Sequence, residues 1–223
     1  MAQQILVVAP HMDDEVLGCG ATICRHVKKG DRVTVLIVAN RAYGHRYDEE
    51  LIQKEKECTQ AAQKVLGYQD LIFLDLPDEC LDQSQIEIIK AMEAVLSGAE
   101  PDVVYLPNRG DNNQDHRSVF TAARIVFRSH SADKTPALRV YEVPSSTDVV
   151  PCFSEFNFQA NLYVDVTEYL SLKIRAMACY EKESRVFPHP RSPEGIEVSA
   201  KKRGIEVGLS AAEAFMVIRD IWR

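Results

Sequence analysis

Residues 5–15 of the chain are Ile-Leu-Val-Val-Ala-Pro-His-Met-Asp-Asp-Glu, an apolar run followed at once by charged residues. A short, continuous apolar run is typical of a strand that is buried on both faces of a parallel sheet. The charged residues come directly before a helix-like stretch at 15–29, so the whole forms a strand–turn–helix unit. A fold of the α/β class is therefore expected.

The same unit recurs along the first half of the chain. Further apolar runs, each read as a strand, lie at 33–38, 71–75 and 103–106. Further helix-like stretches lie at 48–66, 82–97 and 116–128. Alternation of strands and helices at a spacing of about 30 residues predicts βαβ units, and hence a mostly parallel sheet covered by helices on both faces.

The second half of the chain is less regular. Strands are expected at 138–143 and 161–166, and helices at 168–183 and 210–221. Residues 184–208 are rich in Pro, Arg, Ser and Gly and are expected to form a long loop, a kind of segment that is often functional. Because no repeat or linker divides the chain, residues 1–223 are expected to form a single domain.

Composition excludes several classes of function. The net charge is -7, from 26 basic and 33 acidic residues. This gives neither the basic patch that nucleic acid requires nor a basic face for anionic lipid. No apolar run is long enough to span a membrane, and residues 1–9 lack the features of an export signal, so a cytoplasmic protein is expected. The six cysteines form no Cys-x-x-Cys pair and are expected to be reduced.

The first cluster of reactive residues directly follows the first strand. It lies where open α/β sheets bind ligands, at the carboxyl end of a parallel strand. His11 and Asp14 are three residues apart at the start of a helical turn, so both can face one point. Asp13 can lie near that point without being a metal ligand. The alternative is that Asp13 or Asp14 only caps the helix.

The second cluster, Asp-Asn-Asn-Gln-Asp-His-Arg at 111–117, follows the fourth strand and again opens a helix. His116 can supply a third ligand. Asp115 can accept a hydrogen bond from a ring N–H, either of His116 or of a neighbouring histidine, and so fix its tautomer. The alternative is that Asp115 caps the helix and His116 is an exposed residue of its first turn.

Two histidines and one carboxylate with a fourth position open are the ligand set of catalytic zinc sites. A metal in such a site activates water and polarises a carbonyl group. Asp13, beside that water but not a ligand, can act as general base. The residues thus predict a metal-dependent hydrolase with His11, Asp14 and His116 as ligands.

The motifs also resemble those of a known family. The hexapeptide at 10–15 resembles the Pro-His-Pro-Asp-Asp-Glu signature of the LmbE-like or PIG-L family of zinc-dependent N-deacetylases, and residues 113–117 are similar to its second motif, which ends in Asp-His. The stretch at 189–194, with 203–204 and 212–215, is similar to the C-terminal block of bacterial members. The resemblance covers nearly the whole chain.

The resemblance implies a Rossmann-like three-layer sandwich and hydrolysis of an acetamide, usually on N-acetylglucosamine joined to another group. It implies the same three ligands, one zinc ion per chain with other divalent ions as alternatives, and Asp13 as the base. Self-association is common in such families, so a homo-oligomer is compatible with it. Met12 replaces the usual proline, and Asn113 stands where some members have a histidine that stabilises the oxyanion.

Amide hydrolysis also needs a proton for the leaving amine, which the Asn113 amide cannot deliver at neutral pH. His189 lies between Pro188 and Pro190, which stiffen its backbone. We expect its loop to fold over the strand ends, with His189 as proton donor and Arg191 and Arg46 holding the substrate. Asp115 acting through a water is the alternative donor.

Two smaller features have two interpretations each. The loop at 40–48, which carries Arg46, fits a phosphate or sugar hydroxyl, or is a solvated loop with a helix cap at Asp48. The Gly18-Cys19-Gly20 stretch lies one turn into its helix and lacks the third glycine of a dinucleotide fingerprint, so it indicates close packing of helix on sheet.

Other functions remain open at this point. Within the family, an amidase that cleaves a thiol–sugar conjugate is the second choice after an amino-sugar deacetylase. From another class, His11-Met12-Asp13 with His116 would also satisfy the facial triad of non-haem iron oxygenases, although these are built on antiparallel barrels. A non-enzymatic nucleotide-binding module is the third alternative.

Overall fold

The computed structural model describes residues 2–129 and 134–222 and contains one seven-stranded sheet. The strands are β1 (Gln4–Ala9), β2 (Arg32–Ala39), β3 (Asp70–Leu76), β4 (Val103–Pro107), β5 (Ala137–Tyr141), β6 (Leu162–Asp165) and β7 (Ala212–Arg219). Their order across the sheet is β3-β2-β1-β4-β5-β7-β6. The first five strands run parallel, and β7 pairs antiparallel with both β5 and β6. The predicted, mostly parallel sheet is confirmed.

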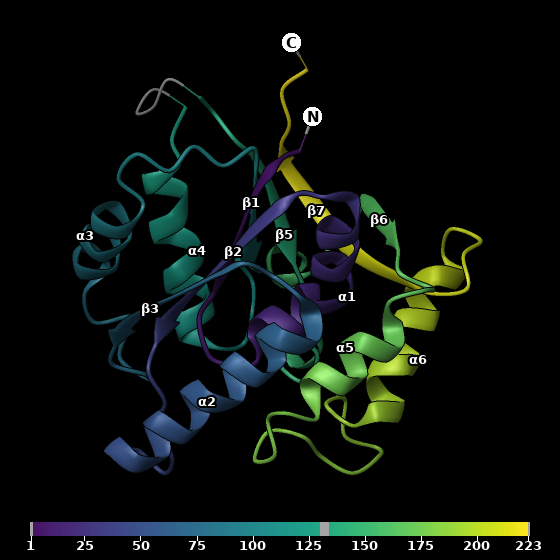
Figure 1. Ribbon diagram of the computed structural model, residues 1–223, viewed down its shortest axis with the longest axis horizontal. Helices are drawn as coiled ribbons and strands as arrows, with labels where there is room; N and C mark the ends of the chain where they lie inside the picture. Colours follow the sequence, from purple (N-terminus) through teal and green to yellow (C-terminus); the bar gives the residue numbers. More distant parts are fainter. Residues whose placement is uncertain (1, 130–133, 223) are drawn as a thin grey trace.

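Helices cover both faces of this sheet (Figure 1). The helices are α1 (Asp14–Lys29), α2 (Glu49–Leu66), α3 (Gln85–Val95), α4 (Gln114–Val126), α5 (Leu170–Met177) and α6 (Pro193–Ile205), with short 3-10 turns η1 (Thr147–Val149) and η2 (Ser154–Phe156). One apolar core lies between the sheet and α1, α2 and α5, and a second lies between the sheet and α3 and α4. The three-layer α/β architecture is therefore as expected. Among the described residues, no helix is long and apolar enough to cross a membrane.

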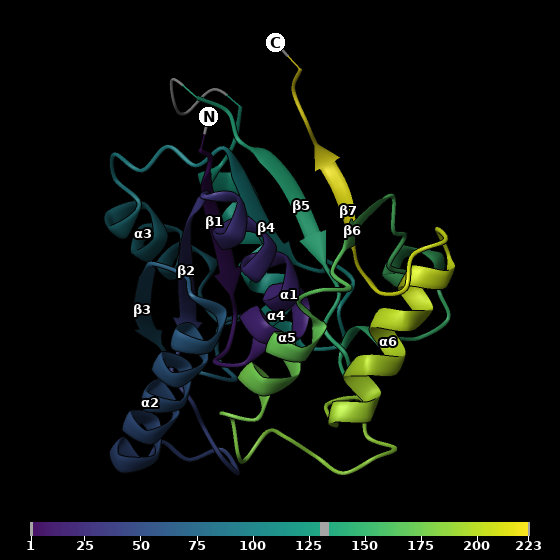
Figure 2. The same cartoon turned by 45° about the vertical axis from the view of Figure 1, so that its right-hand side comes forward.

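The C-terminal predictions were partly wrong. The helix expected at 210–221 is strand β7, which Figure 2 shows beside β5 and β6. Alanines at 211, 212 and 214 favour a helix locally, but residues 212–215 are buried within the sheet, and small side chains fit there. Tertiary packing has overridden the local propensity. The helix expected at 168–183 is shorter, since α5 ends at Met177.

The long loop expected at 184–208 contains helix α6. The Ser192 side chain accepts a hydrogen bond from the Gly195 N–H at 2.9 Å, and Pro193 occupies the first helical position, which is a standard helix start. Glycine at 195 and 204 and the lack of an apolar stripe hid the helix from the sequence pattern. Gly195 is needed because a Cβ there would lie 2.7 Å from the backbone oxygens of His189 and Pro190.

Helix α1 lies close against the sheet at Gly18. A Cβ at this position would overlap the ring of Tyr141 on β5. That ring is fully buried, and its hydroxyl donates to the Val8 carbonyl on β1 at 2.8 Å. The interpretation of the glycine pair as a feature of close packing is therefore supported. The contact at Gly18 sets the distance between α1 and the sheet.

A buried ion pair connects α1 to the C-terminal half of the chain. Lys173 on α5 lies 2.6 Å from Glu213 on β7, and both side chains are buried. The Glu213 carboxylate accepts from the backbone N–H groups of Ala21 (3.1 Å) and Thr22 (2.7 Å), while Lys173 donates to the Leu17 carbonyl at 2.8 Å. These contacts join α5 and β7, which are distant in sequence, to the middle of α1.

Replacing Lys173 by Met should destabilise the protein markedly, because it leaves the Glu213 carboxylate buried without its cation. We expect the free energy of unfolding in urea to fall by about 3–5 kcal/mol. The control is Lys201→Met, which removes an exposed pair with Glu197 and should cost less than about 1 kcal/mol. Equal losses in the two variants would contradict the role of the buried pair.

Candidate metal centre

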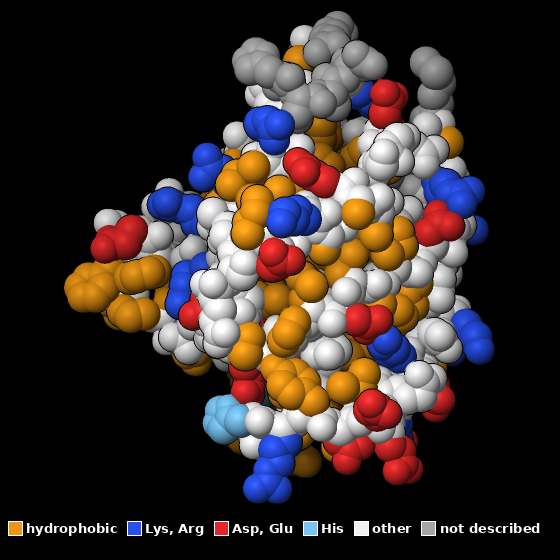
Figure 3. Space-filling model, turned by 90° about the vertical axis from the view of Figure 1, so that its left-hand side faces the viewer, with side chains coloured by type: hydrophobic (Ala, Val, Ile, Leu, Met, Phe, Trp, Pro, Cys, Tyr) orange, Lys and Arg blue, Asp and Glu red, His pale blue; other side chains and the backbone are white. Residues whose placement is uncertain are grey.

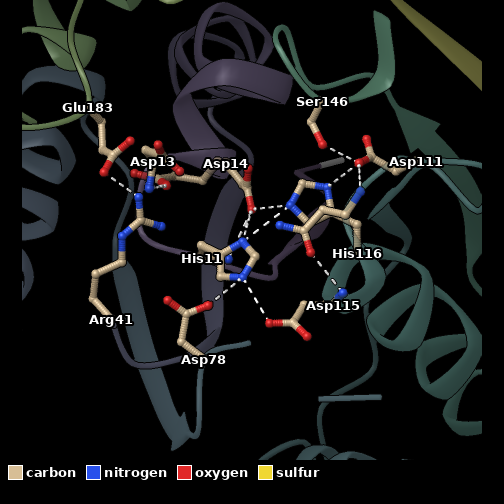
Figure 4. Close-up of polar contacts among 12 residues, drawn as sticks. His11, Asp13, Asp14, Arg41, Asp78, Asp111, Asp115, His116, Ser146 and Glu183 are labelled. Carbon is tan, nitrogen blue, oxygen red and sulfur yellow. Dashed lines mark hydrogen bonds and ion pairs between the residues drawn. The ribbon is translucent and has the colours of Figure 1, made fainter. Parts of the chain in front are cut away.

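The ends of β1 and β4 bring the two sequence clusters together. These strands are parallel neighbours, with Val7 opposite Tyr105. His11 follows β1, Asp14 begins α1, and His116 lies in the first turn of α4. All three side chains are buried, and they point toward one another (Figure 4).

Three potential ligand atoms form a nearly equilateral triangle. Asp14 Oδ2 lies 3.2 Å from His11 Nδ1 and 3.1 Å from His116 Nε2, and the two ring nitrogens are 3.2 Å apart. Ligands on a tetrahedral zinc ion, with bonds near 2.0–2.2 Å, are separated by about 3.3 Å. The spacing of the three atoms therefore fits a single small cation.

The outer nitrogen of His11 faces two carboxylates, and that of His116 faces a third. His11 Nε2 lies 3.0 Å from Asp78 and 3.3 Å from Asp115, and His116 Nδ1 lies 3.4 Å from Asp111. These contacts favour a proton on each outer nitrogen, so the inner nitrogen of each neutral ring could donate its lone pair to a cation beside Asp14. The donor chemistry therefore also fits a metal.

The carboxylates behind the rings are themselves held by hydrogen bonds. Asp115 accepts from the backbone N–H groups of Glu79 (2.8 Å) and Leu81 (3.1 Å). Asp78 accepts from the Ala42 N–H at 2.9 Å. The histidine partner expected for Asp115 is thus found, and it is His11. Since Asp115 is tied to the backbone, it orients the ring from a fixed position.

Asp111 is held in the same way behind His116. Its carboxylate accepts hydrogen bonds from the Ser146 hydroxyl, from the Thr147 hydroxyl at 2.6 Å and from the Asn113 N–H at 2.9 Å. The roles of Asp78 and Asp111 were missed from the sequence. Both lie just beyond a strand end, and that position was the signal that could have found them.

Asp13 has an unusual backbone conformation. Its φ is 122°, in a region that non-glycine residues rarely adopt, and such strain is concentrated at functional sites. Its side chain makes no helix-cap hydrogen bond. The Asp14 carboxylate accepts from the His11 N–H at 3.0 Å, within the cluster. The capping alternative therefore does not explain the aspartate pair.

The Asp13 carboxylate points to Arg191, whose Nη1 lies 2.9 Å from Asp13 Oδ2. Burial raises the pKa of Asp13 to about 6, although the charge of Arg191 opposes the shift. A group that titrates near neutrality is suited to accept and release protons. Asp13 is thus next to the ligand triangle in sequence and is not part of it in space.

The arginine that reaches this region from the loop after β2 is Arg41. Its guanidinium pairs with the buried carboxylate of Glu183. Arg46, which was predicted to hold substrate, is exposed, and its backbone bridges to Tyr43. Asp48 caps α2 by accepting from the Leu51 N–H at 3.0 Å, as the second interpretation of this loop expected. Glu183 carried no signal in the sequence.

His189 and Asn113 are not part of the ligand triangle: Asn113 lies three residues before His116, and His189 contacts Arg191, which pairs with Asp13. His189 is half-buried, and its Nδ1 accepts from the Arg191 N–H at 3.1 Å. Burial and the charge of Arg191 lower its pKa. The Asn113 side-chain oxygen caps α4 through the Asp115 N–H at 2.8 Å, which leaves its amide NH₂ as a donor.

A large groove among the described residues lies elsewhere. A groove of about 1210 Å³ follows the edge strand β3 near the starts of β1 and β2, and Figure 3 shows apolar and charged side chains mixed on this side. The ligand triangle lies at the opposite ends of the strands. The residues that line the groove include none of His11, Asp14 and His116, so the metal centre is the better candidate for the functional site.

A family model described as PIG-L: GlcNAc-PI de-N-acetylase matches residues 6–127, more than half of the 223 residues. The chain belongs to the PIG-L family. The matched segment contains all three ligands and Asp13, so the resemblance noted in the sequence is confirmed.

Three known proteins illustrate what this PIG-L family chain is similar to. The uncharacterized deacetylase YaiS of Escherichia coli K12 is 27% identical over 78% of this chain and 88% of its own. The N,N'-diacetylchitobiose deacetylase of Pyrococcus horikoshii is 20% identical, with a TM-score of 0.79 over 97% of this chain and 84% of that one. The 4-carboxy-2-hydroxymuconate hydratase GalB of Pseudomonas putida is 18% identical, with a TM-score of 0.77 over 99% and 98%.

Loss of one ligand should empty the metal centre, because three protein ligands leave no redundancy. We expect protein purified without chelator to carry about one divalent ion per chain, and His116→Ala to lose most of it, as measured by elemental mass spectrometry. His45→Ala, which changes an exposed histidine, is the matched control. Full occupancy in His116→Ala would refute the assignment.

Metal uptake should release protons. Burial disfavours the charged form of His116, but Asp14 and Asp111 outweigh it and raise its pKa to about 9, so the ring is protonated at pH 7 without metal. The ring must lose that proton to bind a cation, and apparent affinity should therefore fall as the pH is lowered. Calorimetry at pH 7 in buffers of different ionisation enthalpy should show at least about one proton released per ion. A binding heat independent of the buffer would contradict this.

Proposed function

We propose that the protein is a zinc-dependent N-deacetylase that hydrolyses the acetamide of an N-acetylglucosamine-type sugar and releases acetate. The observation that carries the proposal is the triangle of His11, Asp14 and His116 with Asp13 beside it and outside it. Membership of the PIG-L family and similarity to deacetylases support the reaction class and the type of substrate.

Each residue around the centre then has a role. A zinc ion held by the triangle would supply an activated water and polarise the acyl oxygen. Asp13 takes the proton of the attacking water, because its pKa lies near neutrality. Asp78 and Asp115 keep His11 oriented, and Asp111 does the same for His116.

The leaving amine needs a proton, and we propose that His189 supplies it. His189 is adjacent to Arg191, whose guanidinium contacts Asp13, so its loop already reaches the centre. With a lowered pKa, His189 rests neutral at pH 7. The proton that Asp13 takes from the attacking water would pass through solvent to His189, which then delivers it to the leaving amine and is neutral again. Asn113 is proposed to donate a hydrogen bond from its side-chain NH₂ to the oxyanion. Arg191, with Arg46 at the rim, is proposed to hold hydroxyl groups of the substrate.

The competing functions are less well supported. An oxygenase triad would use Asp13 as a ligand, but Asp13 contacts Arg191, and the carboxylate of the triangle is Asp14. The sheet is mostly parallel rather than an antiparallel barrel. The hydratase GalB shares the fold, so water addition to a carbon–carbon double bond needs a direct test.

A substrate panel tests the proposal. Zinc-loaded protein is incubated with N-acetylglucosamine conjugates, including sugar nucleotides, chitobiose-type disaccharides, glycolipids and thiol-linked sugars, and acetate release is measured. We expect release from at least one class and its loss with a chelator. Cleavage of a thiol conjugate elsewhere than at the acetyl group would favour the amidase alternative. Hydration of an unsaturated acid without acetate release would favour the hydratase.

Asp13→Asn should separate the base from the ligands. The variant should keep its metal and its fold but lose about 10²–10⁴-fold in turnover number, the range for removing a general base. Asp82→Asn, an exposed aspartate, is the control and should match the wild type. If Asp13→Asn loses metal while Asp14→Asn keeps it, the two roles are reversed.

His189→Ala tests the proton donor. We expect the turnover number to fall by about 10²-fold, with metal content unchanged, because a general acid is lost. Val186→Ala, an exposed side chain of the same loop, is the control. Wild-type turnover in His189→Ala would make Asp115 acting through a water the better candidate.

A further inference from the structure

A buried carboxylate outside the metal centre holds two arginines. Glu183 follows α5 and is only 4% exposed. Its Oε1 pairs with Arg41 and accepts from the Tyr43 hydroxyl at 3.2 Å, while its Oε2 lies 2.5 Å from Arg191 Nη1. A buried charge is retained only where it is paired and hydrogen-bonded, and Glu183 meets that condition through residues of two separate loops.

Both arginines act on Asp13. Arg191 contacts its carboxylate, and Arg41 lies close enough for its charge to oppose protonation of Asp13. Figure 4 shows Arg41, Glu183 and Asp13 grouped on one side of the ligand triangle. Two carboxylates therefore face two guanidinium groups, and this wall of the site is balanced in charge.

The contact between Arg191 and Asp13 involves one nitrogen only. Arg191 Nη1 donates both to Asp13 Oδ2 at 2.9 Å and to Glu183 Oε2, and its Nε donates to the Ser145 hydroxyl at 2.8 Å. Its Nη2 has no hydrogen-bond partner within 2–129 and 134–222. An unrestrained guanidinium prefers a two-nitrogen, fork-like pair with a carboxylate, which would occupy both oxygens of Asp13.

We propose that Glu183 is a positioning residue that holds Arg191 in this one-nitrogen contact with Asp13. One Asp13 oxygen is then free for the attacking water, and Arg191 Nη2 is free for a hydroxyl of the sugar. Arg41 and Tyr43 keep Glu183 in place from the other loop. The inference rests on the proposed deacetylase function and adds the residue that keeps the base accessible.

Glu183→Gln tests it, because this change keeps the size of the side chain and removes its charge. We expect the turnover number to fall by about 10–10²-fold, within the range for a misplaced catalytic group, with zinc content unchanged. Glu181→Gln is the matched control, since Glu181 is 77% exposed and only 3.9 Å from Lys54. Equal turnover in the two variants would overturn the proposal.

A double-mutant cycle distinguishes positioning from general structural damage. If Glu183 acts through Arg191, the Glu183→Gln/Arg191→Gln variant should be no slower than Arg191→Gln alone. Fully additive losses would overturn the proposal. Glu183→Asp, which keeps the charge but is shorter, serves if Glu183→Gln does not fold. It should lose turnover in the same direction, and wild-type turnover in it would also overturn the proposal.

One measurement does not depend on activity. Hydrogen exchange of the zinc-loaded protein should increase at 40–47 and 183–192 in Glu183→Gln but not in Glu181→Gln, because Glu183 joins these segments. If no substrate releases acetate but hydrogen exchange increases as expected, the proposed deacetylase function fails, while the role of Glu183 in holding Arg191 is supported. If acetate is released but hydrogen exchange and turnover in Glu183→Gln match those of the control, the positioning role of Glu183 is wrong, while the deacetylase function stands.

Discussion

The carboxylates behind His11 and His116 set the orientation of both imidazole rings, on which the geometry of the centre depends. Each imidazole has its outer nitrogen against a buried aspartate, so both inner nitrogens are directed to Asp14. Without a cation, the nearby carboxylates outweigh burial and raise the pKa values of both rings, so the protonated form of each ring is favoured. A cation bound between the inner nitrogens would displace protons from the rings, so metal binding and the buried charge are linked.

The ligand side chains keep their spacing only if the sheet and helices that carry them form a rigid frame. Parallel pairing of β1 and β4 sets the distance between the two clusters, and α1 carries Asp14 in its first turn. Close packing at Gly18 and the Lys173–Glu213 pair fix α1 against the sheet and the C-terminal elements. Because a metal site tolerates errors of only a few tenths of an ångström, features remote from the centre contribute to its geometry.

The sequence was sufficient for the parts that depend on local pattern. Buried strands, the first four helices and the three predicted ligands follow from apolar runs and from residues at strand ends. It was insufficient where tertiary contacts decide. β7 has helix-forming alanines but lies inside the sheet, and α6 has a good cap but no apolar stripe. Glu183 has no local motif, and Arg41 differs from Arg46 only in which way the loop folds.

The same architecture in GalB supports a hydratase, so the sheet and its helices do not select the reaction. A ligand triangle with a base beside it activates water, and water can add to an amide or to a double bond. Under the proposed function, the loops around Asp13, where Arg41, Arg191 and Glu183 lie, are the part of the site that could distinguish these reactions. These residues come from loops rather than from the frame, and loops can change without disturbing the sheet. The residues beside Asp13 are thus supplied by loops, whereas the ligand triangle is supplied by the ends of the frame.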